Sequence, residues 1–363
     1  MGDQDLPGVL VSGFKGPHGI CEDHVRDLQK HFHLITMEEF LENKTQLAPK
    51  IRAVFVWGGR PAVDRELLRS LPSLRIVASA GAGLDHLDLA LIASSGVKVA
   101  STPHAVSSPT ADLGMALLLA AARRVVEGHQ LAVSPDTEKF SINWMGQGVT
   151  GATLGIIGMG SIGYKIAQRA RAFEMKILYH NRKRRKLEEE GAVGATYCAR
   201  LDDLLQWSDF VMLAVSLTPQ TQGLVGRREL SLMKPSATLI NIGRGPLVDQ
   251  DALVEALQTG VIKAAALDVT SPEPLPSSAG VRRLPQHLHG QGAWGPGAQI
   301  ARMEAAQNRL FHVLRLPTGP SLLYGASKAD FDHSSTDLHY FNHYILSWSF
   351  FFFEAKYLHI LYL

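Results

Sequence analysis

The stretch Thr153-Leu-Gly-Ile-Ile-Gly-Met-Gly-Ser-Ile-Gly163 decides the fold of this chain. Its first half is a short apolar run that suits a buried parallel strand. Gly158, Gly160 and Gly163 follow with the spacing G-x-G-x-x-G, and residues 164–173 predict a helix. In that context the first glycine allows a tight turn, the second lets the backbone approach a pyrophosphate, and the third lets helix and strand pack closely. The stretch therefore predicts a dinucleotide site.

The residues around this motif indicate which dinucleotide is bound. Ser161 and Ile162 stand where the N–H groups and the positive dipole end of a helix would hold phosphates. The next predicted strand, residues 176–180, ends at Asn181, where NAD sites usually carry an acidic residue for the ribose hydroxyl groups. Arg182 and Arg185 belong to a cation cluster that could pair with a 2′-phosphate. We expect NADP(H), with NAD(H) as the alternative cofactor; the competing interpretation is a solvated basic loop or a localisation signal.

Bulk properties exclude several other classes of protein. The chain has 363 residues, a net charge of +2 and 19% charged residues, so we expect two domains and neither a nucleic-acid nor a membrane partner. Two cysteines are too few for a disulfide framework, which favours a reducing compartment. The acidic N-terminus lacks a signal-peptide core, and no apolar run is long enough to span a bilayer. We expect a soluble cytoplasmic protein without a metal site.

Strands and helices alternate along most of the chain, which predicts parallel α/β domains. Residues 1–107 form the expected first domain, with strands at 9–12, 53–57, 75–79 and 97–100 and helices at 21–31 and 64–71. Residues 103–109 are predicted to be a hinge, followed by a connecting helix at 110–124. Residues 108–290 form the expected second, doubly wound domain, with later strands at 210–215, 238–242 and 264–269 and helices at 202–207, 228–232 and 249–258. Residues 291–363 are a divergent C-terminal segment that we expect to be poorly ordered.

Residues 9–276 resemble the D-isomer-specific 2-hydroxyacid dehydrogenases, and within them the glyoxylate/hydroxypyruvate reductases. The matching pieces, besides the glycine motif, are Gly83-Leu84-Asp85-His86, Leu217-Thr218-Pro219 with Thr221, Asn241-Ile242-Gly243-Arg244-Gly245, and Asp268-Val269 followed by Pro272-Glu273-Pro274-Leu275. The resemblance implies a Rossmann dinucleotide domain, a smaller flavodoxin-like substrate domain, and a homodimer. The implied activity is NADPH-dependent reduction of a small 2-keto acid, glyoxylate or hydroxypyruvate, to the 2-hydroxy acid.

The resemblance also assigns roles to individual residues. Arg244 matches the arginine that holds the substrate's carboxylate and keto oxygen, and Glu273 matches the glutamate that supports a catalytic histidine. The backbone amides of Ala82 and Gly83 match the loop that receives the substrate carboxylate. Three further residues match positions that contact the nicotinamide half of the cofactor: Ser216, Ile242 and Asp268. The competing interpretations are a surface salt bridge for Arg244 and an ordinary loop carboxylate for Glu273.

The family's catalytic histidine has no clear counterpart here. It normally follows the glutamate by about twenty residues in a Pro-His-x-Gly-Ser/Thr context, as the resemblance implies. His289 is the candidate, but Leu288 replaces the proline and no Ser or Thr follows at the right place. A solvent-exposed loop histidine is the competing interpretation. Two hypotheses for the chain follow: a working reductase, or a cofactor-binding variant that is catalytically impaired.

Overall fold

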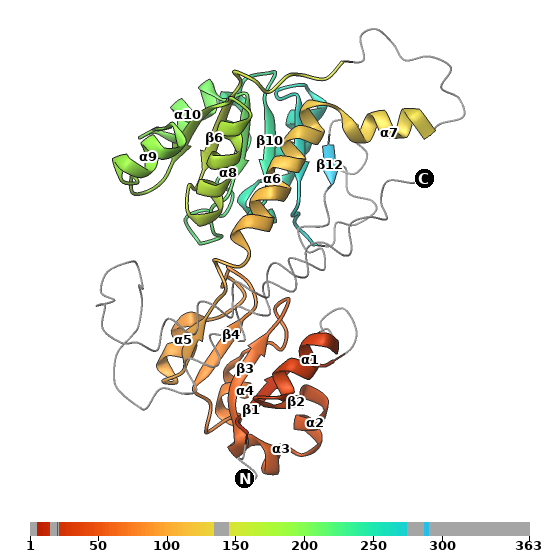
Figure 1. The fold of residues 1–363 in the computed structure, drawn as a ribbon, viewed down its shortest axis with the longest axis vertical. Coiled ribbons are helices and arrows are strands. Elements are labelled where there is room, and N and C mark those ends of the chain that lie inside the picture. Colours follow the sequence, from red (N-terminus) through yellow and green to blue (C-terminus); the bar gives the residue numbers. More distant parts are fainter. Residues whose placement is uncertain (1–5, 15–19, 21, 134–144, 274–286, 290–363) are drawn as a thin grey trace. The chain divides into compact units, whose positions relative to one another are not determined.

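The computed structural model describes residues 6–14, 20, 22–133, 145–273 and 287–289. Within these ranges the strands form two parallel sheets, one of five strands and one of seven (Figure 1). Helices connect the strands and cover both faces of each sheet. The prediction of a two-domain α/β fold is thereby confirmed. The predicted C-terminal segment, residues 291–363, lies outside the described residues.

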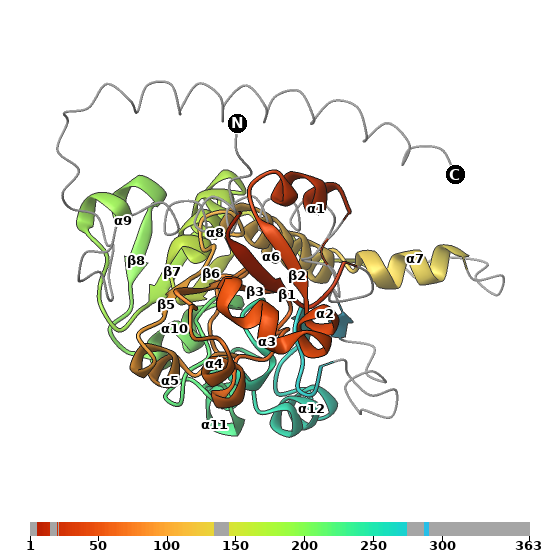
Figure 2. The same cartoon turned by 90° about the horizontal axis from the view of Figure 1, so that it is seen from below.

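The first sheet has the strand order β2-β1-β3-β4-β5, which is the flavodoxin-like order. Its strands are β1 (Gly8–Val11), β2 (His33–Thr36), β3 (Ile51–Val56), β4 (Ile76–Ser79) and β5 (Lys98–Ala100). The connecting helices are α1 (Glu22–Gln29), α2 (Met37–Glu42), α3 (Lys44–Leu47), a 3₁₀ turn at Ala48–Lys50, α4 (Arg65–Ser70) and α5 (Leu89–Ser94). Figure 2 shows α1 on one side of these strands and α3, α4 and α5 on the other. The sheet is therefore doubly wound.

The second sheet has the order β12-β11-β10-β9-β6-β7-β8. Its strands are β6 (Thr153–Ile157), β7 (Lys176–His180), β8 (Ala195–Tyr197), β9 (Phe210–Leu213), β10 (Thr238–Asn241), β11 (Ala264–Leu267) and β12 (His287–His289). Its helices are α6 (Ser107–Ala122), α7 (Val125–Val133), α8 (Ser161–Ala172), α9 (Leu187–Val193), α10 (Leu201–Trp207), α11 (Arg227–Leu232), a 3₁₀ turn at Gly245–Leu247 and α12 (Gln250–Gln258). Counted from β6, this is the Rossmann order 3-2-1-4-5-6 with β12 added beside β11.

Side-chain alternation along the strands builds the two cores of the second sheet. Phe210 and Met212 face α6 and α8, whereas Val211 and Leu213 face α10, α11 and α12. All four are buried to 1% exposure or less, so both faces of β9 are covered. Such strands are apolar throughout, which explains why β6 and β9 could be recognised as short continuous apolar runs.

Several local predictions hold and others are wrong. The helices predicted at 64–71 and 249–258 are α4 and α12, and Asp64 and Asp249 cap them, each accepting a hydrogen bond from the backbone N–H three residues on. The helix after the glycine motif begins at Ser161, three residues earlier than predicted, because Gly163 packs inside its first turn. The predicted hinge at 103–109 is too long, since α6 begins at Ser107 and takes Pro109 into its first turn, where proline is tolerated. Short elements were missed: β2, α2, α3, α5, α7, α9, β8 and β12.

None of the described helices combines the length and the apolar character needed to cross a membrane.

Candidate dinucleotide and carboxylate site

The glycine turn joins β6 to α8 and is fixed by contacts that exclude side chains. Gly158 has a φ of +97°, a conformation that L side chains rarely adopt, and a Cβ there would lie 2.8 Å from the backbone carbonyl carbon of Ala214. A Cβ on Gly163 would collide with the carbonyl oxygen of Gly158. By contrast, a Cβ on Gly160 would meet none of the described residues within 4 Å. The first and third glycines thus serve packing, whereas the second leaves open space at the helix N-terminus.

This turn lies at the topological switch point of the sheet. β6 pairs with β7 on one side and β9 on the other, so the chain reverses its winding direction there. Ligands of open α/β sheets bind outside the carboxyl ends of the strands at such a point. Ser216 follows β9 at this edge, and its carbonyl oxygen accepts a hydrogen bond from Thr221 Oγ1 at 2.8 Å. The predicted phosphate residues, Ser161 and Ile162, precede the first backbone bond of α8, from Tyr164 to Gly160.

Asn181 ties the end of β7 to the glycine turn. Its Oδ1 accepts a hydrogen bond from the Met159 N–H at 2.7 Å, and its Nδ2 donates to the Met159 carbonyl oxygen at 3.3 Å. Arg185 converges on the same residue, because its Nη1 donates to the Met159 carbonyl oxygen at 2.8 Å. Its Nη2 donates to Glu189 at 2.9 Å, and its guanidinium lies over the Tyr164 ring. Both predicted cofactor residues are therefore engaged within the protein.

A buried Tyr179–Glu190 pair, joined by the exposed Arg184, holds the loop that carries the cations. Tyr179, which is fully buried, donates its hydroxyl hydrogen bond to Glu190 and accepts one from the backbone N–H of Arg185. Arg184 donates two hydrogen bonds of 2.8 Å to the Glu190 carboxylate. The Arg184 and Tyr179 hydrogen bonds lower the pKa of Glu190 to about 2, and burial raises the pKa of Tyr179 to about 12. These hydrogen bonds fix Arg184 and Arg185 of the loop after β7 to the buried Tyr179–Glu190 pair.

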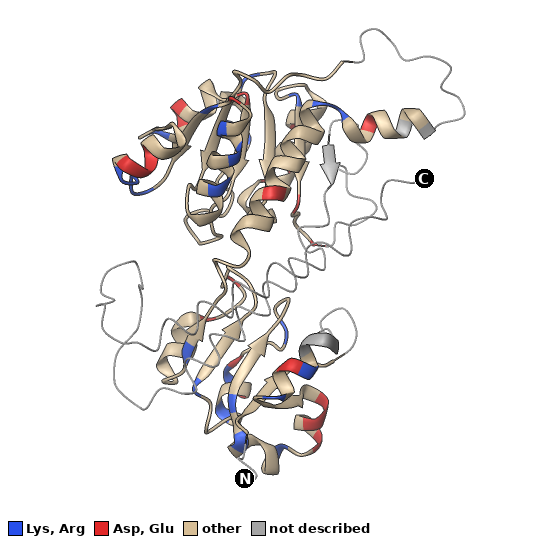
Figure 3. Cartoon of the chain, viewed as in Figure 1, with Lys and Arg blue, Asp and Glu red and all other residues tan. Residues whose placement is uncertain are grey.

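Arg182 and Lys183 stand apart from this network. Both are exposed, and within the described part of the chain neither forms a hydrogen bond or an ion pair. Figure 3 shows cations in the loop that leads into α9 and acidic residues on that helix. Of the two predicted arginines, Arg185 is thus bonded within the protein, whereas Arg182 has no partner among the described residues.

Arg244 lies just beyond β10, on a backbone shaped by its neighbours. Asn241 accepts a hydrogen bond from the Gly243 N–H at 3.0 Å and donates one to the Arg244 carbonyl oxygen at 2.8 Å. A Cβ on Gly243 would lie 2.9 Å from the Val215 carbonyl oxygen, and one on Gly245 would collide with Thr270. The glycines on both sides of Arg244 are required by these close approaches.

The Arg244 side chain reaches the loop after β4. Its Nε donates to both carboxylate oxygens of Asp85, at 3.1 and 3.2 Å, and its Nη1 donates to the Gly243 carbonyl oxygen at 2.8 Å. Its Nη2 occupies the space that a Cβ on Gly83 would fill. The predicted carboxylate-binding loop and the predicted catalytic arginine, more than 150 residues apart in sequence, are thereby in contact. The interpretation of Arg244 as one partner of a salt bridge also holds, because its partner Asp85 belongs to that same loop.

Two further titratable groups respond to this arginine. Partial burial raises the pKa of Glu273, and the positive charge of Arg244 opposes that rise. Burial also lowers the pKa of His86; the neighbouring Asp85 raises it and Arg244 lowers it. Arg244 therefore acts electrostatically on both Glu273 and His86, and Asp85 acts on His86 as well.

The remaining predicted residues follow neighbouring strands. Ile242 follows β10, is buried, and lies against Gly114 of α6. Asp268 follows β11, is buried, and donates its backbone N–H to the Asn241 carbonyl oxygen at 2.9 Å. His289 ends β12, where its Cα pairs with that of Leu267, and its side chain lies outside the described part of the chain. Its role in catalysis stays a prediction.

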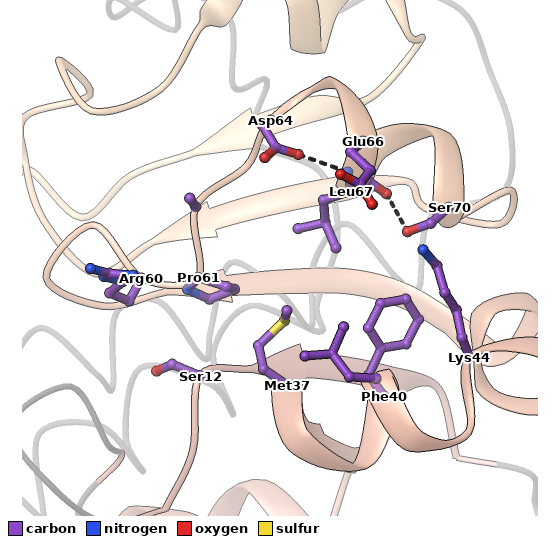
Figure 4. A pocket seen from close by; sticks show the side chains of 12 residues that line it. Ser12, Met37, Phe40, Lys44, Arg60, Pro61, Asp64, Glu66, Leu67 and Ser70 are labelled. Atoms are coloured by element: carbon purple, nitrogen blue, oxygen red, sulfur yellow. Dashed lines mark hydrogen bonds between the residues drawn. The ribbon is translucent and has the colours of Figure 1, made fainter.

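A separate hollow of about 530 Å³ lies in the first α/β unit, between α2, α3 and the start of α4 (Figure 4). Met37 and Phe40 line it on one side and Leu67 on the other, and charged groups such as Lys44 and Arg60 lie around it. None of the predicted site residues lines it.

Sequence reasoning did not identify the residues that hold the predicted site residues in place through hydrogen bonds. Met159, Tyr179 and Glu190 anchor the cation loop, and Asp85 orients Arg244. The one available signal was the acidic residue in Gly83-Leu84-Asp85-His86, which the motif contains but to which no role was assigned. A buried tyrosine–glutamate pair eleven residues apart carries no pattern that a sequence alone reveals.

The fold and the site together define a dinucleotide-binding α/β protein with an arginine directed at the loop after β4. Residues 115–289 match the family model of the D-isomer-specific 2-hydroxyacid dehydrogenase NAD-binding domain. A glyoxylate reductase of Thermococcus onnurineus is 40% identical over 276 residues, which cover 74% of this chain and 80% of that protein. The chain belongs to the D-isomer-specific 2-hydroxyacid dehydrogenase family.

Two further relatives define the extent of the likeness. A glyoxylate reductase of Thermococcus litoralis is 45% identical over 217 residues, and the match covers 58% of this chain and 65% of that protein, slightly less than two thirds of its length. The NADPH-dependent glyoxylate/hydroxypyruvate reductase of Sinorhizobium meliloti, solved in complex with NADP and malonate, superposes with a TM-score of 0.74 at 28% identity. That superposition covers 85% of this chain and 94% of the other.

Proposed function

We propose that this protein reduces a small 2-keto acid, glyoxylate or hydroxypyruvate, to the 2-hydroxy acid with NADPH. The observation that supports the proposal is the contact of the Arg244 guanidinium with Gly83 and Asp85 on the loop after β4. A planar guanidinium with one nitrogen directed at such a loop suits a carboxylate next to a keto group.

The residues of the glycine turn fit a dinucleotide. The space beside Gly160 would admit a pyrophosphate, and the N–H groups of Ser161 and Ile162 would bind it at the start of α8. Arg182, which has no partner among the described residues, supports NADPH over NADH, because a 2′-phosphate needs a positive counter-charge and the ribose hydroxyl of NADH does not. Asn181 and Arg185 would shape this end of the site through Met159.

When bound, the nicotinamide supplies a hydride to the keto carbon. Arg244 stabilises the negative charge that develops on the keto oxygen, and the amides of Ala82 and Gly83 hold the substrate carboxylate. Asp85 fixes the direction of the guanidinium through Nε, so that Nη2 remains directed at the loop. Ser216, Ile242 and Asp268 would flank the nicotinamide half.

We further propose that residues 1–107 act as the substrate domain and residues 108–290 as the dinucleotide domain. A cytoplasmic homodimer is the expected form, supported by the low cysteine content and by the family resemblance. The second candidate function is a cofactor-binding variant with little turnover, which is favoured by the absence of a proline before His289.

The test is an NADPH titration together with an assay of NADPH consumption in the presence of glyoxylate or hydroxypyruvate. Arg244→Ala should lower kcat/KM by about 10²–10³ while the Kd for NADPH stays unchanged. Arg200→Ala, which removes an exposed guanidinium paired only with surface carboxylates of α10, is the matched control and should change neither. NADPH binding without turnover would select the second candidate, and a folded protein that binds neither NADPH nor NADH would overturn both.

A further inference from the structure

The sequence lacks the motif that carries the family's catalytic histidine, the expected proton donor. The described site nevertheless contains an imidazole, that of His86. His86 follows Asp85 directly, on the loop that begins where β4 ends at Ser79. Arg244 likewise follows the carboxyl end of a parallel strand, and it contacts that loop through Asp85. Among the histidines with described side chains, His86 is the one whose pKa shift involves Arg244.

The ring of His86 is held in a defined orientation. Its Nε2 lies 3.3 Å from the hydroxyl oxygen of Ser79, a residue that is 3% exposed. Nδ1 forms no hydrogen bond within the described ranges, so it is the nitrogen left to exchange a proton with a ligand. The turn that contains Gly59 and Arg60 packs beside its Cβ. The charged groups that act on the ring are Asp85 and Arg244.

We propose that His86 supplies the proton to the keto oxygen in this protein. The inference rests on the proposed reductase function. As the keto carbon receives hydride, the C=O electron pair moves to oxygen, the N–H bond of protonated His86 breaks and the O–H bond forms. The products are the 2-hydroxy acid and a neutral imidazole, which solvent reprotonates.

The electrostatics of the loop couple this proton to substrate binding. In the free protein, burial and Arg244 keep the pKa of His86 below its usual range. A substrate carboxylate bound at Arg244 would place a negative charge near the ring, which favours the protonated form. The imidazole would therefore gain its proton when a keto acid arrives.

Activity and affinity measurements on His86→Gln test the role directly. The variant should lower kcat for NADPH-dependent reduction by about 10²–10⁴, the usual contribution of a general acid, and leave the Kd for NADPH unchanged. Wild-type kcat should fall as the pH rises through the His86 titration, and the variant should lose that dependence. His33→Gln removes an exposed imidazole at the amino end of β2 and should match the wild type. A His86→Gln enzyme with kcat within about threefold of the wild type, or with an unchanged pH profile, overturns the proposal.

A second readout does not depend on turnover. In an NMR titration of the histidine ring signals, the signal missing from His86→Gln identifies this residue. Oxamate, an unreactive analogue of a 2-keto acid, should raise its pKa; an unchanged pKa at saturating oxamate overturns the proposal. If the wild type binds NADPH but consumes none, the proposed function fails and the proton transfer fails with it. If the wild type turns over and His86→Gln equals it, only the role of His86 fails.

Discussion

Substituting alanine for the first and for the second glycine of the motif should separate the fold from the cofactor site. Gly158 has a φ of +97°, and a Cβ there would lie 2.5 Å from Val215 Cγ1 and 2.8 Å from both the Ala214 carbonyl carbon and the Val215 nitrogen. Gly160 has a φ of −80°, and no atom of the described residues lies within 4 Å of a Cβ added there. The same methyl group is thus added once against backbone and once into open space.

The magnitudes follow from these contacts. Cβ atoms essentially never approach closer than 3.0 Å, so Gly158→Ala must displace the loop after β9. Overpacking and a strained backbone each cost about 1–3 kcal/mol, so the variant should lose about 2–6 kcal/mol of unfolding free energy. Gly160→Ala should lose less than about 1 kcal/mol, the scale of an N-cap change. Its methyl group would occupy the pyrophosphate space and should raise the Kd for NADPH at least about tenfold, or about 1.4 kcal/mol.

Urea unfolding and NADPH titration by fluorescence measure the two effects on the same preparations. The loss in Gly158→Ala should lower Tm by about 2–4 °C per kcal/mol. A Gly160→Ala protein that binds NADPH as tightly as the wild type would refute the assignment of that space to a phosphate. A Gly158→Ala protein as stable as the wild type would refute the packing argument.

Three further substitutions probe the surroundings of the site. Glu190→Gln weakens the bonds to Arg184 and should lower the unfolding free energy by about 1–3 kcal/mol at neutral pH. The wild type should also lose stability as the pH falls from the ordinary glutamate value of 4.5 towards about 2, because a depressed pKa stabilises the fold only while the group is ionised; the variant should show less of this loss in acid urea titrations. Arg182→Ser should raise the KM for NADPH about tenfold or more and leave that for NADH unchanged, so equal effects on both cofactors would contradict its phosphate role. Asp85→Asn should lower kcat, because Arg244 loses the partner that fixes its direction. KM should change less, because the substitution also removes a negative charge that repels the anionic substrate. Steady-state kinetics in which KM alone rises would contradict a positioning role for Asp85.

Much of the chemistry was accessible from short segments of sequence. Gly158 and Gly163 could be assigned because a glycine motif between a strand and a helix has few physical solutions. Arg244 and Glu273 were selected by their motif context, and the structure places the charge of Arg244 near Glu273. Predictions failed where segments were short: β8 has three residues, too few for any hydrophobic period to appear.

The sequence by itself determined the two α/β units and the glycine turn, because periodicity and local backbone requirements are encoded within a few neighbouring residues, and the family resemblance singled out the arginine. Only the tertiary structure decided that Asp85 holds Arg244, that Glu190 and Tyr179 anchor the cation loop, and that Asn181 bonds to Met159. These partners come from different strands, helices and loops, and the three-dimensional fold brings them within hydrogen-bonding distance. The strength of ion pairs and hydrogen bonds depends on the distance between the groups in space, and the spacing of residues along the chain does not predict that distance.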